Sequence, residues 1–528
     1  MHACVSGTRT ADKDAKPILP FPDVYARASL LWFDGQFQAT IDALDEAEPK
    51  TVVEQADKAL LRSRALTRAK KFEEALEAAS IPVSSLDEDR VATSFLLQSM
   101  ALARMGKLEE STTCLGRISD LSSLHRTVQA EIHLQYAYIA YVRADFQASR
   151  RSLVHGLLKA DDIVLARAQE MVGYVNVAEE KYAEAARSFQ QAMATLSTSR
   201  HRDGQLELNI FCESAALATE RLDTGNTEAF DAAYERLRWP EDIEGMRFQA
   251  EQNLGMLHYV AGNMDKAWTH LSAALQFTAK EPAYRLIAHA NLMMLHRTLG
   301  ETFSATQHLR AGAEFLSEVD WLEAHPNRRG ALFEYLIEGA RLGEVMDRTV
   351  LEPLRSLPGG KSVRRQKGAD RRFQAVHLTA LGNVLAQSSI DRGVATLNRA
   401  LDAWLDLGYR FRISTTAMDL YRLTRNPEYV ELAAAQTSAS RAGFLKDELK
   451  TVHRLESRGI ANLTRAERRI LPAVIEGKNA AQIARESGRA EQTIKNQIRS
   501  LFARLGVKTR FELLKVCVEF GLTGTDSR

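Results

Sequence analysis

The chain has few of the residues that cross-link secreted domains or interrupt helices. Its 528 residues include 12 prolines and 4 cysteines. Cys4, Cys114, Cys212 and Cys517 are scattered, without the paired spacing of a zinc site or a redox motif. No apolar run approaches the roughly 18 residues of a membrane span, and no export signal begins the chain. We therefore expect no membrane partner, no metal site and a reducing, cytoplasmic location.

Residue sets that indicate an enzyme are also missing. No Ser/His/Asp set or carboxylate pair stands out, and the 13 histidines lack metal-ligand spacing. Gly360-Lys361-Ser362 looks like the end of a phosphate-binding loop, but Arg355 occupies the position of its first glycine and no strand precedes it. We expect no catalytic residues and no cofactor.

The basic stretch from Lys361 to Arg372 has two interpretations. The first is an exposed loop between helix pairs, and the second is an additional contact to DNA or phosphate.

What the chain does contain is a long helical body. Residues before position 458 are too many for one ordinary domain and show no alternation of strand-like and helical segments. Small and apolar residues recur in pairs of helical segments around short turns. The clearest copy has Leu254-Gly255, Gly262, Met264, Ala267 and Leu271, and others have Val172-Gly173, Tyr182, Ala185 and Phe189, or Leu292, Gly300, Phe303, Ala305 and Leu309.

In this pattern small residues mark the points where two helices approach closely, and large apolar residues fill the gaps between turns. Weaker copies centre near residues 36, 71, 107, 145, 226, 344 and 389, at spacings of about 35 to 45 residues. The pattern resembles tetratricopeptide repeats, and it predicts an irregular α-solenoid of roughly ten or eleven helix pairs. Such arrays usually hold a peptide, a partner protein or a small molecule on their inner surface, so we expect an effector whose identity and contact residues stay open.

The C-terminal segment has a different pattern. Ile494, Ile498, Leu501 and Leu505 recur at spacings of four, three and four, which predicts a helix with one buried stripe. Lys495, Asn496 and Arg499 then fall on the opposite side of that helix. Arginine can pair with guanine and asparagine with adenine, while lysine suits a base edge or a phosphate.

The order of motifs identifies this segment more closely. Leu463-Thr464-Arg465-Ala466-Glu467 is followed by residues 479–484, then by residues 492–499, and Leu505-Gly506-Val507-Lys508-Thr509-Arg510 closes the pattern. It resembles the LuxR-type (GerE-like) helix-turn-helix domain. The resemblance implies a groove-facing set of Lys495, Asn496 and Arg499, with Thr493, Gln492, Lys508 and Arg510 at the phosphate backbone. Gln497, which replaces a frequent histidine, completes the candidate DNA-binding residues.

By the same resemblance, double-stranded DNA is the partner and the protein binds it as a homodimer. The last helix, with Leu513, Leu514 and Phe520, would contribute to the dimer. The charge agrees, because residues 459–528 hold 13 Lys and Arg against 7 Asp and Glu, a net charge of +6 on a chain whose total is +1.

Several positions depart from the family pattern. Pro472 lies inside the first helix, Ser487 and Arg489 replace aliphatic residues of the turn, and Ala490 stands where a capping serine is common. These departures keep an alternative open, in which the protein is a protein-binding helical scaffold with a vestigial helix-turn-helix.

The sequence as a whole predicts an all-α protein. Residues 1–20 would form a disordered arm, residues 21–457 a tetratricopeptide-like helical repeat domain, and residues 458–528 the LuxR-type helix-turn-helix bundle. The combination predicts a transcription regulator in which the repeats sense an effector and the C-terminal domain reads DNA.

Overall fold

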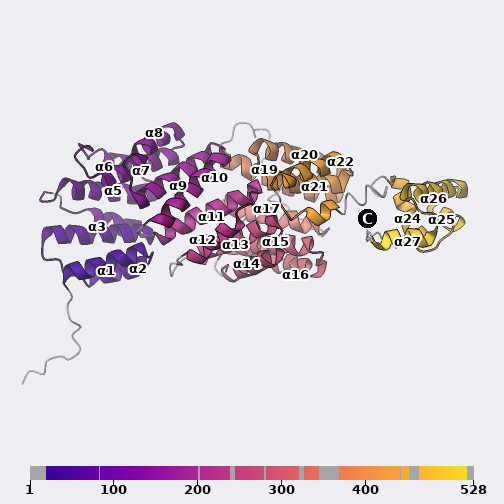
Figure 1. Cartoon of the computed structure of the whole chain (residues 1–528), viewed down its shortest axis with the longest axis horizontal. Helices are drawn as coiled ribbons and strands as arrows, with labels where there is room; N and C mark the ends of the chain where they lie inside the picture. The colour runs from indigo at the N-terminus through magenta and orange to yellow at the C-terminus, as the bar shows by residue number, and fades with distance from the viewer. Residues whose placement is uncertain are drawn as a thin grey trace, which may run out of the picture. The chain divides into compact units, whose positions relative to one another are not determined.

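The computed structural model describes residues 20–82, 84–199, 203–237, 239, 244–278, 281–319, 321, 326–343, 368–440, 442–450 and 463–519. All its regular elements in this part of the chain are helices (Figure 1). None of these helices is long and apolar enough to cross a lipid bilayer. The arm predicted for residues 1–20, except Pro20, lies outside the described residues, as do Gly360-Lys361-Ser362 and the first residues, 458–462, of the predicted helix-turn-helix bundle.

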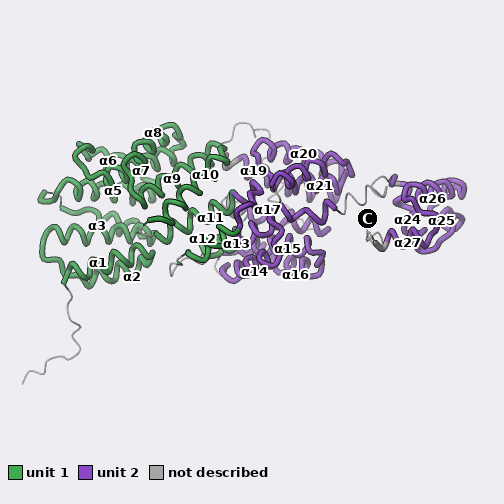
Figure 2. Tube along the Cα trace, in the orientation of Figure 1, with its two compact units in different colours: residues 1–217, 228–253, 365–369 green, residues 218–227, 254–364, 370–528 purple. Residues whose placement is uncertain are grey.

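The chain divides into two compact units, coloured separately in Figure 2. Unit 1 comprises residues 1–217, 228–253 and 365–369, and unit 2 comprises residues 218–227, 254–364 and 370–528. Unit 1 is built from α1 (Phe21–Phe33), α2 (Phe37–Asp45), α3 (Val52–Arg68), α4 (Phe72–Ala79), α5 (Glu88–Arg104), α6 (Leu108–Leu115), α7 (Arg126–Val142), α8 (Phe146–Leu157), α9 (Asp162–Ala178), α10 (Tyr182–Thr198), most of α11 (Gly204–Arg221), α12 (Thr227–Arg236) and the start of α13 (Glu244–Ala261).

Unit 2 continues with α14 (Met264–Gln276), α15 (Pro282–Thr298), α16 (Thr302–Ala313), the 3₁₀ turn η1 (Leu316–Glu318), α17 (Pro326–Arg341), α19 (Gly368–Ser388), α20 (Ile390–Leu407), α21 (Arg410–Thr424) and α22 (Pro427–Ser438). Its last four helices are α24 (Arg465–Ile475), α25 (Ala480–Ser487), α26 (Glu491–Leu505) and α27 (Arg510–Glu519).

The helices of unit 1 form successive antiparallel pairs. Each odd-numbered helix from α1 to α9 packs against the even-numbered helix that follows it, and α1, α3, α5, α7 and α9 pack side by side in that order. This is the stacked arrangement of a tetratricopeptide-like solenoid, in which each pair buries apolar surface against its neighbours. The predicted fold class is therefore confirmed, including the pairs centred near residues 36, 71, 107 and 145.

Close helix approach at glycine explains the repeat pattern. A Cβ added to Gly173 would lie 2.6 Å from the ring of Phe189, and one added to Gly255 would lie 2.8 Å from Cγ of Leu271. The larger partner in each case is buried and comes from the second helix of the pair. These contacts confirm the interpretation that small residues mark the points of closest packing.

The same reasoning fails at Phe303. Its side chain is 75% exposed, whereas Leu292, Ala305 and Leu309 of that repeat copy are buried. Phe303 is the second residue of α16, and its side chain does not face the other helix of the pair. The prediction that it fills the space between turns is wrong.

The end of the predicted basic loop is helical. Residues 368–372 belong to the first turn and a half of α19. Arg371 pairs with Asp406 at 3.4 Å, and Arg372 pairs with Glu220 at 3.5 Å. For these residues the loop prediction is wrong, and the remainder of the basic stretch lies outside the described residues. The sequence also missed the helix pair of α21 and α22, which begins immediately after the left-handed Gly408.

Candidate nucleic-acid interface

The first helix of the C-terminal domain begins at a capping box. The Thr464 hydroxyl accepts a hydrogen bond from the Glu467 amide, and the Glu467 carboxylate accepts one from the Thr464 amide at 2.7 Å. Pro472 lies within α24, yet the helix continues to Ile475, and the Glu476 amide donates to the Pro472 carbonyl at 2.9 Å. The proline therefore does not end this helix.

Glu467 also fixes α24 against α26. Its buried carboxylate accepts a hydrogen bond from Ser500 at 2.6 Å and one from Nε of Arg504 at 3.1 Å. Burial disfavours the ionised form, but the bonds from Ser500 and Thr464 outweigh that effect, so the pKa of Glu467 lies below its ordinary value. The ionised Glu467 carboxylate therefore holds α26 in one orientation against α24.

A single apolar core lies beneath these helices. It contains Ile494, Leu501 and Leu505 of α26 together with residues of the other three helices, and Ile498 packs against it from the edge. The remaining buried members are Leu463, Ile470, Leu471, Val474, Ile483, Ala484, Val507, Leu513, Val516 and Cys517. The buried stripe predicted for this helix is thus confirmed.

A tight turn links α25 to α26. A second capping box, formed by Asn479 and Gln482, starts α25, and Gly488 ends it with φ of 67°. No side chain caps α26, because Ala490 occupies the position of the cap. Arg489, a departure from the expected aliphatic residue, is exposed.

The outer face of α26 carries the residues that the sequence singled out. Gln492, Lys495, Asn496 and Arg499 are exposed and follow the spacing three, one, three, which places them on one side of the helix. Lys495 pairs with Glu491 at 2.9 Å, and Nε2 of Gln492 donates to Oδ1 of Asn496 at 3.2 Å. The Arg499 side chain has neither an ion pair nor a hydrogen bond with another described residue.

The other candidate DNA-binding residues differ in how exposed they are and in whether they already form hydrogen bonds. Thr493 and Lys508 are exposed. Gln497 is half-buried, and its Oε1 is buried without a hydrogen-bond partner among the described residues. Arg510 donates to the carbonyl oxygens of Gly477 at 2.8 Å and Lys478 at 2.6 Å, so it connects the start of α27 to the loop before α25. That contact is structural, and no motif in the sequence predicts it.

The arrangement is two helices joined by a tight glycine-containing turn, with an exposed polar and cationic face on the second. Residues 461–517 match the family model described as bacterial regulatory proteins, luxR family. The C-terminal domain is a LuxR-family helix-turn-helix domain. It occupies the end of the chain, and the match does not extend into the repeats.

The repeats have their own structural matches. The crystal structure of Rap protein complexed with competence and sporulation factor is 13% identical, with a TM-score of 0.38, and the match covers 72% of this chain and 99% of that one. The crystal structure of the APC/C hetero-tetramer Cut9-Hcn1 is 10% identical, with a TM-score of 0.27 and coverage of 94% and 98%. No curated protein matches the chain.

The last helix of the LuxR-family domain differs from expectation in one respect. Leu513 is fully buried in the domain core and is not available to a partner, whereas Phe511 is 77% and Leu514 40% exposed. The prediction of Leu513 as a dimer residue is wrong for that reason, and Phe520 lies outside the described residues. Burial raises the pKa of the Cys517 thiol to about 11, as in a packed, unreactive cysteine.

Proposed function

We propose that the chain is a DNA-binding transcription regulator in which α26 enters the major groove and the helical repeats act as the sensor. The proposal rests on the exposed polar and cationic face of α26. The apolar stripe buried on the opposite side of α26, together with the hydrogen bond between Ser500 of α26 and Glu467 of α24, holds this face outward. Helix-turn-helix domains place base-reading residues near the start of the second helix, where this face begins.

The roles follow from side-chain chemistry. Arg499 suits bidentate pairing with guanine and Asn496 with adenine, while Lys495 reaches a base edge or a phosphate. Gln497 would need to turn out of its half-buried position to reach a base.

Backbone contacts would come from the edges of the helix. Thr493, Gln492 and Lys508 are exposed and suited to phosphate. Arg510 uses two of its N–H groups on the carbonyls of Gly477 and Lys478, which leaves its remaining donors for a phosphate. Because no side chain caps α26, the amides of its first two residues, Glu491 and Gln492, can also donate to a phosphate oxygen.

We further propose that the protein is cytoplasmic and binds a two-fold DNA site as a homodimer. The exposed Phe511 and Leu514 of α27 support the dimer, since apolar side chains at such exposure gain from a partner surface. The effector of the repeats is a peptide, a protein or a small molecule.

The test uses the full-length chain. Sequences bound from a random duplex library are selected, and affinity for the selected duplex and for an unselected one is measured by fluorescence anisotropy at several salt concentrations. The proposal predicts binding that weakens as salt rises, by a slope of about 0.9 for each phosphate contacted, and a clear preference for the selected duplex. Absence of salt-dependent binding at low salt would favour the alternative, a protein-binding scaffold with a vestigial helix-turn-helix, for which the uncapped Ala490 is the main support.

A further inference from the structure

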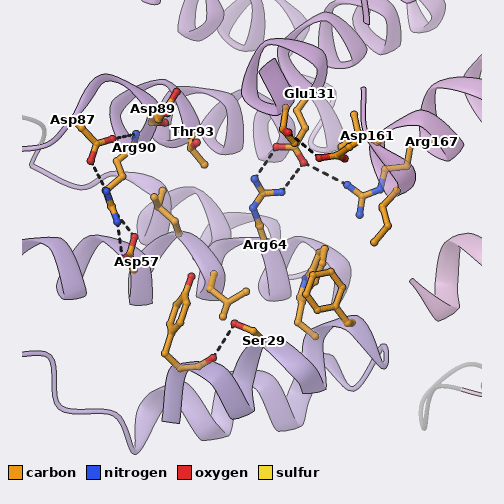
Figure 3. A pocket seen from close by; sticks show the side chains of 18 of the residues that line it. Ser29, Asp57, Arg64, Asp87, Asp89, Arg90, Thr93, Glu131, Asp161 and Arg167 are labelled. Carbon is orange, nitrogen blue, oxygen red and sulfur yellow. Dashed lines mark hydrogen bonds and ion pairs between the residues drawn. The ribbon is translucent and has the colours of Figure 1, made fainter. Parts of the chain in front are cut away.

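Unit 1 contains a large cavity that the DNA-binding proposal does not use. Its volume is about 1010 Å³, at the upper end of the range for small-molecule sites. It is lined by the first helices of five successive pairs, α1, α3, α5, α7 and α9 (Figure 3). These are the helices that form the continuous face of the array, so the cavity is a groove running across several repeats.

The inner wall of the groove contains a set of ion pairs. Arg64 donates to both carboxylate oxygens of Glu131, at 3.0 and 2.8 Å, and Figure 3 shows it reaching upward to them. Arg167 lies 3.8 Å from the same carboxylate and 2.7 Å from Asp203. Burial opposes ionisation of Glu131, but Arg64 outweighs it and keeps the pKa of this carboxyl below its ordinary value. These charges are neutralised within the wall.

Over the whole lining, however, carboxylates outnumber cations. The cavity lining has seven carboxylates, Asp57, Asp87, Glu88, Asp89, Glu131, Asp161 and Asp162, against three arginines, Arg64, Arg90 and Arg167, a net charge of −4 when all are ionised. Arg90 pairs with both Asp57 and Asp87. Glu88, Asp89, Asp161 and Asp162 form no ion pair with a described residue.

Glu88 and Asp89 lie in the first turn of α5, Asp162 lies in the first turn of α9, and Asp161 is the residue just before α9; these four carboxylates form the rim. A helix N-terminus carries roughly half a positive charge, which stabilises them in the ionised form but offsets only part of their charge. The rim therefore remains anionic and favours a cationic occupant.

The floor of the groove is apolar. Tyr25, Trp32 and Phe33 of α1 and Leu60 and Leu61 of α3 line it. The indole N–H of Trp32 has no hydrogen-bond partner among the described residues. A ligand that fits this floor must bring apolar groups as well as positive charge.

The two acidic groups lie on either side of the start of α7. Asp89 accepts a hydrogen bond from the His125 amide at 2.7 Å, and Asp161 accepts one from the Thr127 hydroxyl at 2.9 Å. An extended peptide, which advances about 3.3–3.6 Å per residue, can therefore place cationic side chains at both groups within a few residues.

We propose that this groove binds a short, extended, basic peptide, with its cationic groups at the first turns of α5 and α9 and its apolar side chains on the floor formed by α1 and α3. This inference rests on the proposed sensor role of the repeats, and it is independent of base reading by α26.

The test titrates the full-length chain into a fluorescein-labelled, amidated hexapeptide of alternating lysine and leucine and follows fluorescence polarisation. Three comparison probes are used: the same peptide with glutamate in place of lysine, the same peptide with serine in place of leucine, and spermine as an unlabelled competitor. The double variant Glu88→Gln/Asp162→Asn removes two exposed rim charges. Its matched control, Glu73→Gln/Glu110→Gln, removes two exposed charges on α4 and α6, outside the groove.

The proposal predicts saturable binding of the lysine–leucine probe, weaker binding of the serine version and none of the glutamate version. The rim variant should weaken binding roughly fivefold, as expected for two exposed ion pairs, and the control should leave it unchanged. Equal loss in both double variants, binding of the glutamate probe, or no binding at all would overturn the proposal. Displacement by spermine at the same concentration as unlabelled peptide would also overturn it, in favour of a polyamine.

DNA anisotropy on the same preparations separates the two proposals. If the protein binds DNA but not the peptide, only the proposed peptide site is contradicted. If it binds the peptide but not DNA, the proposed transcription regulator is contradicted instead.

Discussion

Cationic side chains have opposite environments in the repeats of unit 2 and in the helix-turn-helix domain. In the repeats, Arg341 is 7% exposed and bonds to Asp419 at 2.7 Å and to Glu338 at 2.5 Å. Arg412 similarly bonds to Glu220 and Glu334. In the helix-turn-helix domain, Arg499 is exposed and has no ion pair with a described residue. Buried, paired arginines fix how helices pack, whereas exposed, unpaired ones remain available to a polyanion.

The largest expected effect comes from breaking a buried pair. Arg341→Met leaves Asp419, which is 2% exposed, and Glu338 with fewer donors, so the free energy of unfolding should fall by about 3–5 kcal/mol. Urea denaturation followed by circular dichroism measures it. The control is Arg27→Met, whose pair with Glu46 is exposed on both sides and should change stability by less than about 1 kcal/mol. Equal, small losses of stability in both variants would show that the buried ion pairs of Arg341 stabilise the fold no more than an exposed pair does.

A second effect should appear in the pH dependence of unit 1. Burial raises the pKa of Glu170 to about 7, against an ordinary value of 4.5. Its folded-state pKa lies above the unfolded one, so the stability it contributes is complete below pH 4.5 and is lost as the pH rises through about 7. Glu170→Gln cannot ionise, and its stability relative to the unmodified chain should rise across that interval by at most about 3 kcal/mol. Thermal melts of both proteins at matched pH values measure the difference, and parallel curves would contradict it.

Glycine allows close helix packing in the repeats and a left-handed backbone in the helix-turn-helix domain. Gly255→Ala forces a Cβ to within 2.8 Å of Leu271, and overpacking of this kind should cost about 1–3 kcal/mol. Gly488→Ala meets no atom within 4 Å but has to adopt φ of 67°, at a cost of about 1 kcal/mol. Denaturation midpoints of the two variants compare them. A smaller loss for Gly255→Ala than for Gly488→Ala would show that the repeats are packed less tightly than the structure indicates.

The smallest effect concerns phosphate contact. Lys508→Ala should weaken binding to selected and unselected duplexes alike and lower the salt slope of binding by roughly 1. The exposed Arg126→Ala, on α7 in unit 1, is the control and should leave the slope unchanged. A loss confined to the selected duplex would instead assign Lys508 to base recognition.

Much of this structure could be predicted from local patterns. The stripe of Ile494, Leu501 and Leu505 is set by helix period alone, and the glycine at 255 requires a neighbour that approaches closely. The exposure of Phe303 could not be predicted, because a repeat pattern gives the register of a helix but not which partner covers its first turn. The burial of Leu513 could not be predicted either, because adjacent leucines of an amphipathic helix, here Leu513 and Leu514, can face either the core or the solvent.

The rest depended on long-range contacts. The connection of Arg510 to the carbonyls of Gly477 and Lys478 joins residues 32 and 33 positions apart. The acidic rim of the groove combines first turns of α5 and α9, whose residues are more than seventy positions apart in sequence and become neighbours only through stacking. The periodicity of residues within one helix does not predict a cluster of side chains that comes from two helices.

The most direct measurement is base preference in the Asn496→Ala/Arg499→Ala variant of the full-length chain. Anisotropy on the selected duplex and on an unselected one gives the ratio of affinities for each protein. If α26 reads the groove, the ratio should collapse, with about 1–3 kcal/mol lost for each residue on the selected duplex and little change on the unselected one. Equal loss on both duplexes, or an unchanged ratio, would contradict the account.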